Sequence, residues 1–239
     1  FMLTEEAHHL YVGETGLARV IQRTLELMKQ EPNEDVTKLG GIPLQMLQRH
    51  FNSWFSVCLD LFGGDDSSNA AHYFAAGLKG RYKESSDKNI GDHVAVEGHY
   101  LMDAPKSDGG TTTLEVPMRR AMNRVLQDAY VDDCNRALRK WNSLISKAGI
   151  DYELTLPSRR FNRELGPFAG RNYTPRGDFV EAVSSVEVRN STTITRADKD
   201  YLAKIMQPVH QRGQFANWIA PPKQGINRQL VDFEYVRFM

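Results

Sequence analysis

The stretch Thr4-Glu5-Glu6-Ala7-His8-His9-Leu10 decides how the rest of this 239-residue chain is interpreted. It lies in a helical pattern that covers residues 3–30 and that Pro32 ends. On a helical wheel at about 100° per residue, Glu6 falls within an apolar stripe and His9 at its margin, so the wheel selects this pair from two overlapping Glu-x-x-His matches. The residues of the stripe are Met2, Leu3, Leu10, Gly13, Leu17, Val20, Ile21, Leu27 and Met28.

A carboxylate and an imidazole on an apolar helix face are costly to bury unless both are compensated. Residues three apart on a helix project side by side, so Glu6 and His9 could bind one metal ion together. Carboxylate with imidazole suits iron or manganese. Gly13, one turn further, would leave space near the metal for dioxygen or substrate. The alternative is an ion pair between Glu6 and His9, which needs no metal.

A complete di-iron site in a helical bundle uses a Glu-x-x-His pair on each of two helices and a carboxylate on each of two others. No second pair is found in this sequence, because Glu is absent three positions before each of the other histidines: His50, His72, His93, His99 and His210. The helical pattern also begins almost at Phe1, without a capping box. We therefore expect the remaining ligands upstream of Phe1, and the chain to be the C-terminal piece of a longer protein.

The composition argues against several classes of protein. Lysine and arginine together number 30, as do aspartate and glutamate, so the net charge is zero and no nucleic-acid or membrane partner is expected. Cys58 and Cys134 lack the spacing of a disulfide framework or a zinc site. The chain has no apolar run near 20 residues, and its first residues lack the basic start and the small-residue cleavage site of a signal peptide, so neither a membrane span nor a signal peptide is expected. A reducing, cytoplasmic location is the expectation.

The remaining sequence predicts a mainly α-helical fold. Residues 84–113 are polar and are expected to form a long loop, and residues 154–177 are rich in proline and glycine. Strand-like alternation is weak and is confined to residues 183–188 and the C-terminus. Further helices are predicted at residues 43–62, 69–83, 115–148 and 198–206, with Gly149 ending the third of these and a short apolar segment at 230–238.

The opening stretch and its continuation, Val12-Gly13-Glu14-Thr15-Gly16-Leu17-Ala18-Arg19-Val20, resemble the last metal-binding helix of a known family. This family comprises the oxygenase components of benzoyl-CoA 2,3-epoxidases, which are ferritin-like di-iron proteins of aerobic benzoate degradation. The Glu-Ala-x-His-Leu part is shared more widely with the small subunits of ribonucleotide reductases. The continuation narrows the resemblance to the epoxidase family. The resemblance extends through residues 159–163 to the C-terminus.

The resemblance implies that residues 1–150 are the C-terminal helices of a ferritin-like di-iron bundle and that residues 151–239 are a loop-rich extension packed on it. Glu6 and His9 match the last two ligands of the family, and they would be both metal ligands and catalytic residues. Two iron ions would bind. The implied enzyme is a monooxygenase that uses dioxygen to epoxidise benzoyl-CoA at the 2,3 position, with electrons from an NADPH-dependent reductase component. The missing N-terminal part of the bundle would be a further partner.

A CoA ester carries phosphates, so arginines are expected to line its entry. Residues 154–177 contain five arginines against one glutamate. The candidates for substrate binding are Gly13, Arg159, Arg160 and Arg163, followed by Arg171 and by Arg119, Arg120 and Arg124 on the long helix. Phe51, Trp54 and Phe55 are expected in the core. Two other interpretations stay open: a related di-iron monooxygenase acting on another acyl substrate such as phenylacetyl-CoA, and a non-catalytic helical module.

Overall fold

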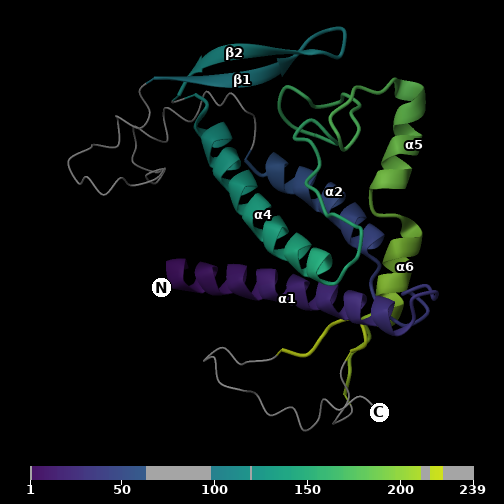
Figure 1. Cartoon of the computed structure of the whole chain (residues 1–239). Coiled ribbons are helices and arrows are strands. Elements are labelled where there is room, and N and C mark those ends of the chain that lie inside the picture. The colour runs from purple at the N-terminus through teal and green to yellow at the C-terminus, as the bar shows by residue number, and fades with distance from the viewer. Residues whose placement is uncertain (1, 63–97, 119, 211–215, 223–239) are drawn as a thin grey trace. The chain divides into compact units, whose positions relative to one another are not determined.

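The computed structural model describes residues 2–62, 98–118, 120–210 and 216–222, and it consists mainly of helices with one small hairpin (Figure 1). The elements are α1 (Met2–Gln30), α2 (Leu44–Asp60), β1 (His99–Pro105), β2 (Thr111–Pro117), α4 (Met122–Lys147), α5 (Ala182–Thr192) and α6 (Arg196–Ile205). The mainly helical prediction is therefore confirmed in this coarse sense. The described helices include none that is long and apolar enough to cross a membrane.

The predictions for the helices at 3–30, 43–62 and 198–206 are confirmed by α1, α2 and α6. Gly149, two residues after the end of α4, has a φ of 76°, which is the left-handed conformation expected of a glycine that ends a helix. Residues 154–177 contain no helix and no strand, apart from an isolated bridge that pairs Tyr173 with Phe179. The predicted helix at 69–83 and the apolar segment at 230–238 lie outside the described residues.

The prediction of a loop over 84–113 followed directly by a helix is wrong for the described residues from 98 onward. β1 and β2 form an antiparallel hairpin in which His99 pairs with Pro117 and Pro105 pairs with Thr111. The consecutive threonines at 111–113 favour a strand because β-branched side chains fit a pleated surface. Residues 115–117, which were predicted to begin the long helix, are instead part of β2, and α4 begins only at Met122.

The weak strand prediction at 183–188 is also wrong, since these residues lie in α5. A short alternation of apolar and polar residues cannot distinguish a strand from a short helix. The helix satisfies its own backbone groups, whereas a strand would need a partner. Val186 is well exposed on α5, so the alternation of valines does not mark a buried sheet face.

The chain divides into two compact units, and each unit draws on residues from both sides of position 150. Unit 1 comprises residues 1–50, 136–155 and 194–239. Within it, the hydroxyl of Thr24 on α1 donates to the carbonyl of Ile42 at 2.6 Å, and the Tyr201 hydroxyl on α6 donates to the carbonyl of Gly41 at 2.6 Å. These bonds hold the loop after α1 to two helices. In the C-terminal half of α1, Ile21 is fully buried.

Unit 2 comprises residues 51–135 and 156–193. Its core joins Phe55 and Leu59 of α2 to Val131 of α4, with Tyr130, Cys134 and Leu156 packed around them. Burial raises the pKa of the Tyr130 hydroxyl, and its hydrogen bonds with the side chains of Cys58 and Cys134 raise it further. Both cysteines are free thiols.

Candidate metal ligands and an arginine-lined pocket

Glu6 and His9 lie side by side on the first turns of α1, because three-residue spacing on a helix places side chains on the same face. The distance from His9 Nδ1 to Glu6 Oε2 is 3.7 Å, and the two side chains are 59% and 67% exposed, respectively. The pairing selected by the helical wheel is therefore present in the structure. Its expected burial is not.

Among the side chains that the structure describes, those of the apolar stripe of α1 are covered only in its C-terminal half. Residues 4–13 are all exposed, and Leu10 of the stripe is 73% exposed. Two hydrogen bonds join Glu14 to α4: its carboxylate accepts one from Lys140 Nζ at 2.7 Å, and its carbonyl accepts one from Trp141 Nε1 at 3.2 Å. A Cβ atom added at Gly13 would meet no atom within 4 Å. The described residues thus leave open space around the Glu6–His9 pair.

The donor set of Glu6 and His9 suits iron in kind but not in number. A carboxylate and an imidazole are ligands that iron accepts. Among the residues that the structure describes, no group of three or more His, Cys, Asp or Glu side chains could hold a metal ion. These residues would therefore supply two ligands of a metal site, and a di-iron centre would need others.

Arginines from residues 159–176 and one arginine from α4 line a common pocket in unit 2. This pocket has a volume of about 270 Å³. Four arginines line it, one from α4 and three from residues 159–176, and the complete lining is Asp103, Arg124, Ser158, Arg159, Arg160, Phe168, Arg176 and Gly177. The structure thus brings Arg159 and Arg160, two of the predicted substrate-binding residues, to the same cavity as Arg124.

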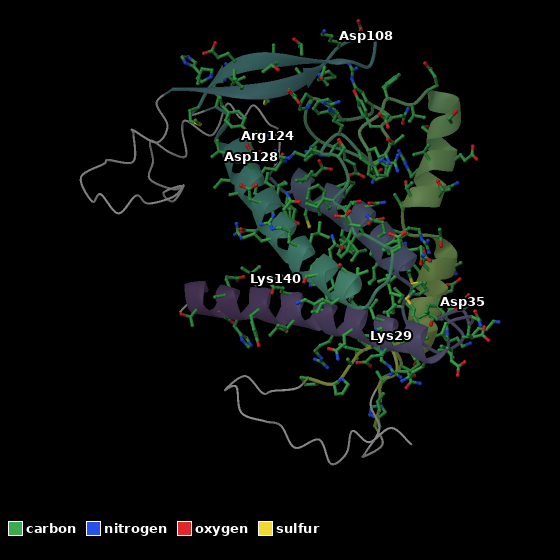
Figure 2. All side chains as sticks on the ribbon, in the orientation of Figure 1. Lys29, Asp35, Asp108, Arg124, Asp128 and Lys140 are labelled. Carbon is green, nitrogen blue, oxygen red and sulfur yellow. The ribbon has the colours of Figure 1, made fainter. Side chains whose placement is uncertain are left out.

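Asp128 on α4 contacts two of the arginines that line the pocket. Its carboxylate accepts hydrogen bonds from Arg159 and from the Tyr100 hydroxyl, and it lies 3.6 Å from Arg124 Nε. Arg124 also donates through Nη1 to Gln127 at 2.9 Å. Figure 2 shows Arg124 and Asp128 following one another along α4, one helical turn apart. One carboxylate therefore orients two arginines of the pocket.

Arg160 is oriented by a ring and by a second carboxylate. Its guanidinium carbon lies 5.7 Å from the centroid of the Phe168 ring, at the range of a cation–π contact. Its Nη2 lies 3.5 Å from Asp103 Oδ2 on β1. Because Asp103 is half exposed, this ion pair contributes little to stability and leaves the guanidinium available to another anion.

A tight turn over residues 174–178 brings Arg176 to the pocket. The amide of Thr174 donates to the carbonyl of Asp178 at 2.8 Å, and the amide of Gly177 donates back to the carbonyl of Thr174 at 2.8 Å. The amide of Ser158 donates to the carbonyl of Pro175 at 2.7 Å. Gly177 has a φ of 94°, and a Cβ there would lie 2.8 Å from Ser158 Oγ. The approach of the two segments therefore requires glycine at this position.

Arg163 and Arg171, also expected near the substrate, do not line this pocket. The Arg163 side chain is fully buried, and its Nε donates to Asp60 Oδ1 at 2.7 Å. Its Nη2 is buried without a hydrogen-bond partner among the described residues. Arg171 donates to the carbonyl of Lys106 at 2.7 Å. Both arginines thus bind other parts of unit 2.

Several residues lie at or near the pocket although the sequence did not indicate them. Arg176, Asp103 and Asp128 carry no motif, and no spacing rule connects them to the 159–163 segment. Phe55 is in the core as predicted, whereas Trp54 is 60% exposed. The prediction for Trp54 is wrong because it projects from the face of α2 that unit 2 does not cover. Arg119 lies outside the described residues.

Comparison with known proteins bears out the resemblance to the oxygenase family. No family model matches the chain. The chain is 42% identical over 242 residues to "Benzoyl-CoA oxygenase component B" of Aromatoleum evansii, an alignment that covers 100% of this chain and 50% of that protein. The chain therefore spans half the length of this relative, which fits the expected likeness to a C-terminal half.

Proposed function

We propose that the chain is part of the oxygenase component of a benzoyl-CoA oxygenase. The observation that carries this proposal is the 42% identity to benzoyl-CoA oxygenase component B, which extends over the whole chain. The relative is named as a component, which supports a system of several proteins. We further propose that the partner is a reductase that supplies electrons from NADPH.

The proposed reaction is a ring epoxidation. One oxygen atom of dioxygen adds across the 2,3 bond of benzoyl-CoA, and the other leaves as water with two electrons and two protons that NADPH and solvent supply. A pair of bound iron ions would supply the redox chemistry with dioxygen. Glu6 and His9 would each bind iron, and the adjacent positions of their side chains on α1 support this role. The other ligands would come from outside the described residues.

The arginine-lined pocket supports a substrate that carries phosphates. Arg159 and Arg160 present planar guanidinium groups, which match the paired oxygens of a phosphate. Both arginines are held by contacts within unit 2, so they are oriented before a ligand arrives. This chain would thus contribute two things to the reaction, a pair of iron ligands and a binding site for the CoA group.

A second candidate function follows from the exposure of Glu6 and His9. As a surface ion pair with no third ligand among the described residues, they would contribute little, and the chain would be a non-catalytic helical module. Iron content distinguishes this candidate from the first.

The decisive experiment compares two pairs of neighbouring variants in protein purified from its native host as the complete complex. Glu6→Ala and His9→Ala are expected to lower the iron content and to abolish oxygenation of benzoyl-CoA, measured by elemental analysis and by mass spectrometry with labelled dioxygen. Glu5→Ala and His8→Ala are the matched controls, because these side chains are also exposed on the same turns of α1. They are expected to keep both properties.

Retention of iron and of ring oxygenation by Glu6→Ala would refute the proposed role of this pair. Equal absence of iron from the wild-type complex and from all four variants would favour the non-catalytic module. Offering phenylacetyl-CoA beside benzoyl-CoA in the same assay separates the proposed enzyme from a related monooxygenase with another substrate.

A further inference from the structure

We propose that the arginine-lined pocket of unit 2 is a binding site for a phosphate or diphosphate group, in which Arg159, Arg160 and Arg176 are the principal ligands. The proposal rests on the geometry of the pocket. Only its connection to CoA depends on the proposed function.

The pocket has an excess of positive charge. Four arginines line it, and its lining contains one carboxylate, that of Asp103. The lining therefore carries more positive than negative groups. A cluster of like charges in a cavity attracts an anion, and guanidinium groups suit a phosphate monoester or a diphosphate.

Arg176 supplies an available donor group. Its backbone amide donates to Thr174 Oγ1 at 3.2 Å, which helps to fix the turn. The Arg176 side chain lines the pocket. Its guanidinium makes no ion pair or hydrogen bond with any residue that the structure describes. The rigid turn at Gly177 therefore presents a charged group whose hydrogen-bonding capacity is unused.

Asp103 limits the affinity of the empty pocket for an anion. Its carboxylate lies near Arg160, and it would repel a phosphate. Because the side chain is half exposed, it can rotate toward solvent when an anion binds Arg160. The pocket thus predicts opposite effects for removal of an arginine and removal of this aspartate.

The size of the pocket limits the ligand that it can hold. A volume of about 270 Å³ is slightly below the range of pockets that enclose a whole drug-sized molecule. It is sufficient for a diphosphate with its first solvation contacts. The pocket would therefore hold the charged end of a larger molecule, such as the nucleotide end of a CoA ester, or a free phosphate compound.

Calorimetric titration of the complete complex, purified from its native host, tests the proposal. The probes are inorganic phosphate, pyrophosphate, adenosine 3′,5′-bisphosphate and CoA. Saturable binding of pyrophosphate is expected, and it should weaken as salt is added. Arg176→Gln should weaken this binding by about tenfold or more, since it removes a charged hydrogen-bond donor. Asp103→Asn should strengthen it severalfold.

Arg196→Gln is the matched control, because Arg196 is an exposed arginine of unit 1, where it pairs with Asp200. It should leave pyrophosphate binding unchanged. The proposal is overturned if the wild-type chain binds no probe saturably, or if Arg176→Gln and Arg196→Gln have equal effects. Circular dichroism checks that the variants fold.

The four probes also separate the pocket from the proposed function. Tighter binding of CoA and of adenosine 3′,5′-bisphosphate than of pyrophosphate, lost in Arg176→Gln, supports a CoA site. Binding of pyrophosphate with the expected variant pattern, but no tighter binding of CoA, supports the pocket and refutes its assignment to CoA. Neither result depends on iron content, which tests Glu6 and His9 separately.

Discussion

Asp198 shows how a single residue can connect segments that are far apart in the chain. It is the third residue of α6, where it accepts hydrogen bonds from Arg49 Nε at 2.7 Å and from the backbone amide of Thr195 at 3.0 Å. The bond from Arg49 is the main reason that the pKa of this carboxyl falls to about 2, and the bonds from Thr195 act in the same direction. Burial acts in the opposite direction. The same side chain therefore completes the capping box of α6 and fastens the helix to α2.

Asp198→Asn should lower the free energy of unfolding by about 2–3 kcal/mol at neutral pH, because the carboxylate is more stable in the folded chain than in the unfolded one. The folded pKa of about 2 lies below the ordinary value of about 3.9. The contribution of Asp198 is therefore fully present above about pH 4 and is lost as the pH falls toward about 2. Urea denaturation at about pH 6 and about pH 3 should show the difference between wild type and variant shrinking at the lower pH.

Asp200→Asn on the same helix is the control, since Asp200 forms an exposed pair with Arg196. Its effect should stay within about 0.5 kcal/mol at either pH. A constant difference between wild type and Asp198→Asn across the pH range would contradict the assigned role of the ionised carboxylate.

At the scale of elements, the β1–β2 hairpin depends on the turn at its end. The turn contains Asp108, which Figure 2 marks at the tip of the hairpin, and it is closed by a hydrogen bond from the amide of Lys106 to the carbonyl of Gly110 at 2.8 Å. Gly109 has a φ of 83°, and a Cβ atom there would lie 2.5 Å from the ring of Phe179. Both the backbone conformation and the packing therefore require glycine.

Gly109→Ala should destabilise the chain by about 2–4 kcal/mol, as the sum of a strained backbone and a steric overlap. Gly170→Ala is the matched control, because Gly170 has a φ of 69° but a Cβ there would meet nothing within 4 Å. That variant should lose only about 1 kcal/mol. Thermal unfolding of both variants provides the comparison, and equal losses would show that Phe179 does not restrict the turn.

At the scale of the whole molecule, each unit is assembled from segments that are distant in the sequence. α2 and α4 both contribute residues to unit 1 and to unit 2. The core of unit 2 joins residues 55 and 59 to residue 131, and its hydrogen bonds include one from Gln127 Nε2 to the carbonyl of Leu59 at 3.0 Å. Stability of this unit therefore depends on long-range packing.

Leu59→Ala should destabilise unit 2 by about 2–5 kcal/mol, because it removes a fully buried side chain and leaves a cavity. Leu61→Ala, two residues further, should change stability by no more than about 0.5 kcal/mol, since Leu61 is 81% exposed. Guanidinium denaturation of the two variants tests the comparison. Similar losses would mean that Leu61 is also covered in solution.

The helices with strong local signals could be predicted from sequence. α1 is marked by its apolar periodicity and by Pro32, which follows its end, and the end of α4 is marked by Gly149. The hairpin could not be predicted, because residues 99–105 form a strand only through pairing with residues 111–117. α5 was missed because its valines do not form a continuous apolar stripe. Local signals are sufficient for a helix, whereas a strand depends on its partner.

The candidate sites divide in the same way. The sequence by itself determined that Glu6 and His9 are neighbours, because helical periodicity sets the spacing of side chains on one helix. It also established the likeness to a benzoyl-CoA oxygenase component, which the comparison confirmed. It grouped the arginines only by their closeness along the chain.

The tertiary structure alone decided which side chains are buried and which converge. It buried Arg163 against Asp60, joined Arg176 and Arg124 to a common pocket, and left Glu6 exposed among the described residues. The physical reason is that burial and convergence are properties of contacts between distant segments. A local pattern specifies the face on which a side chain lies, but only the packing of other segments determines what covers that face.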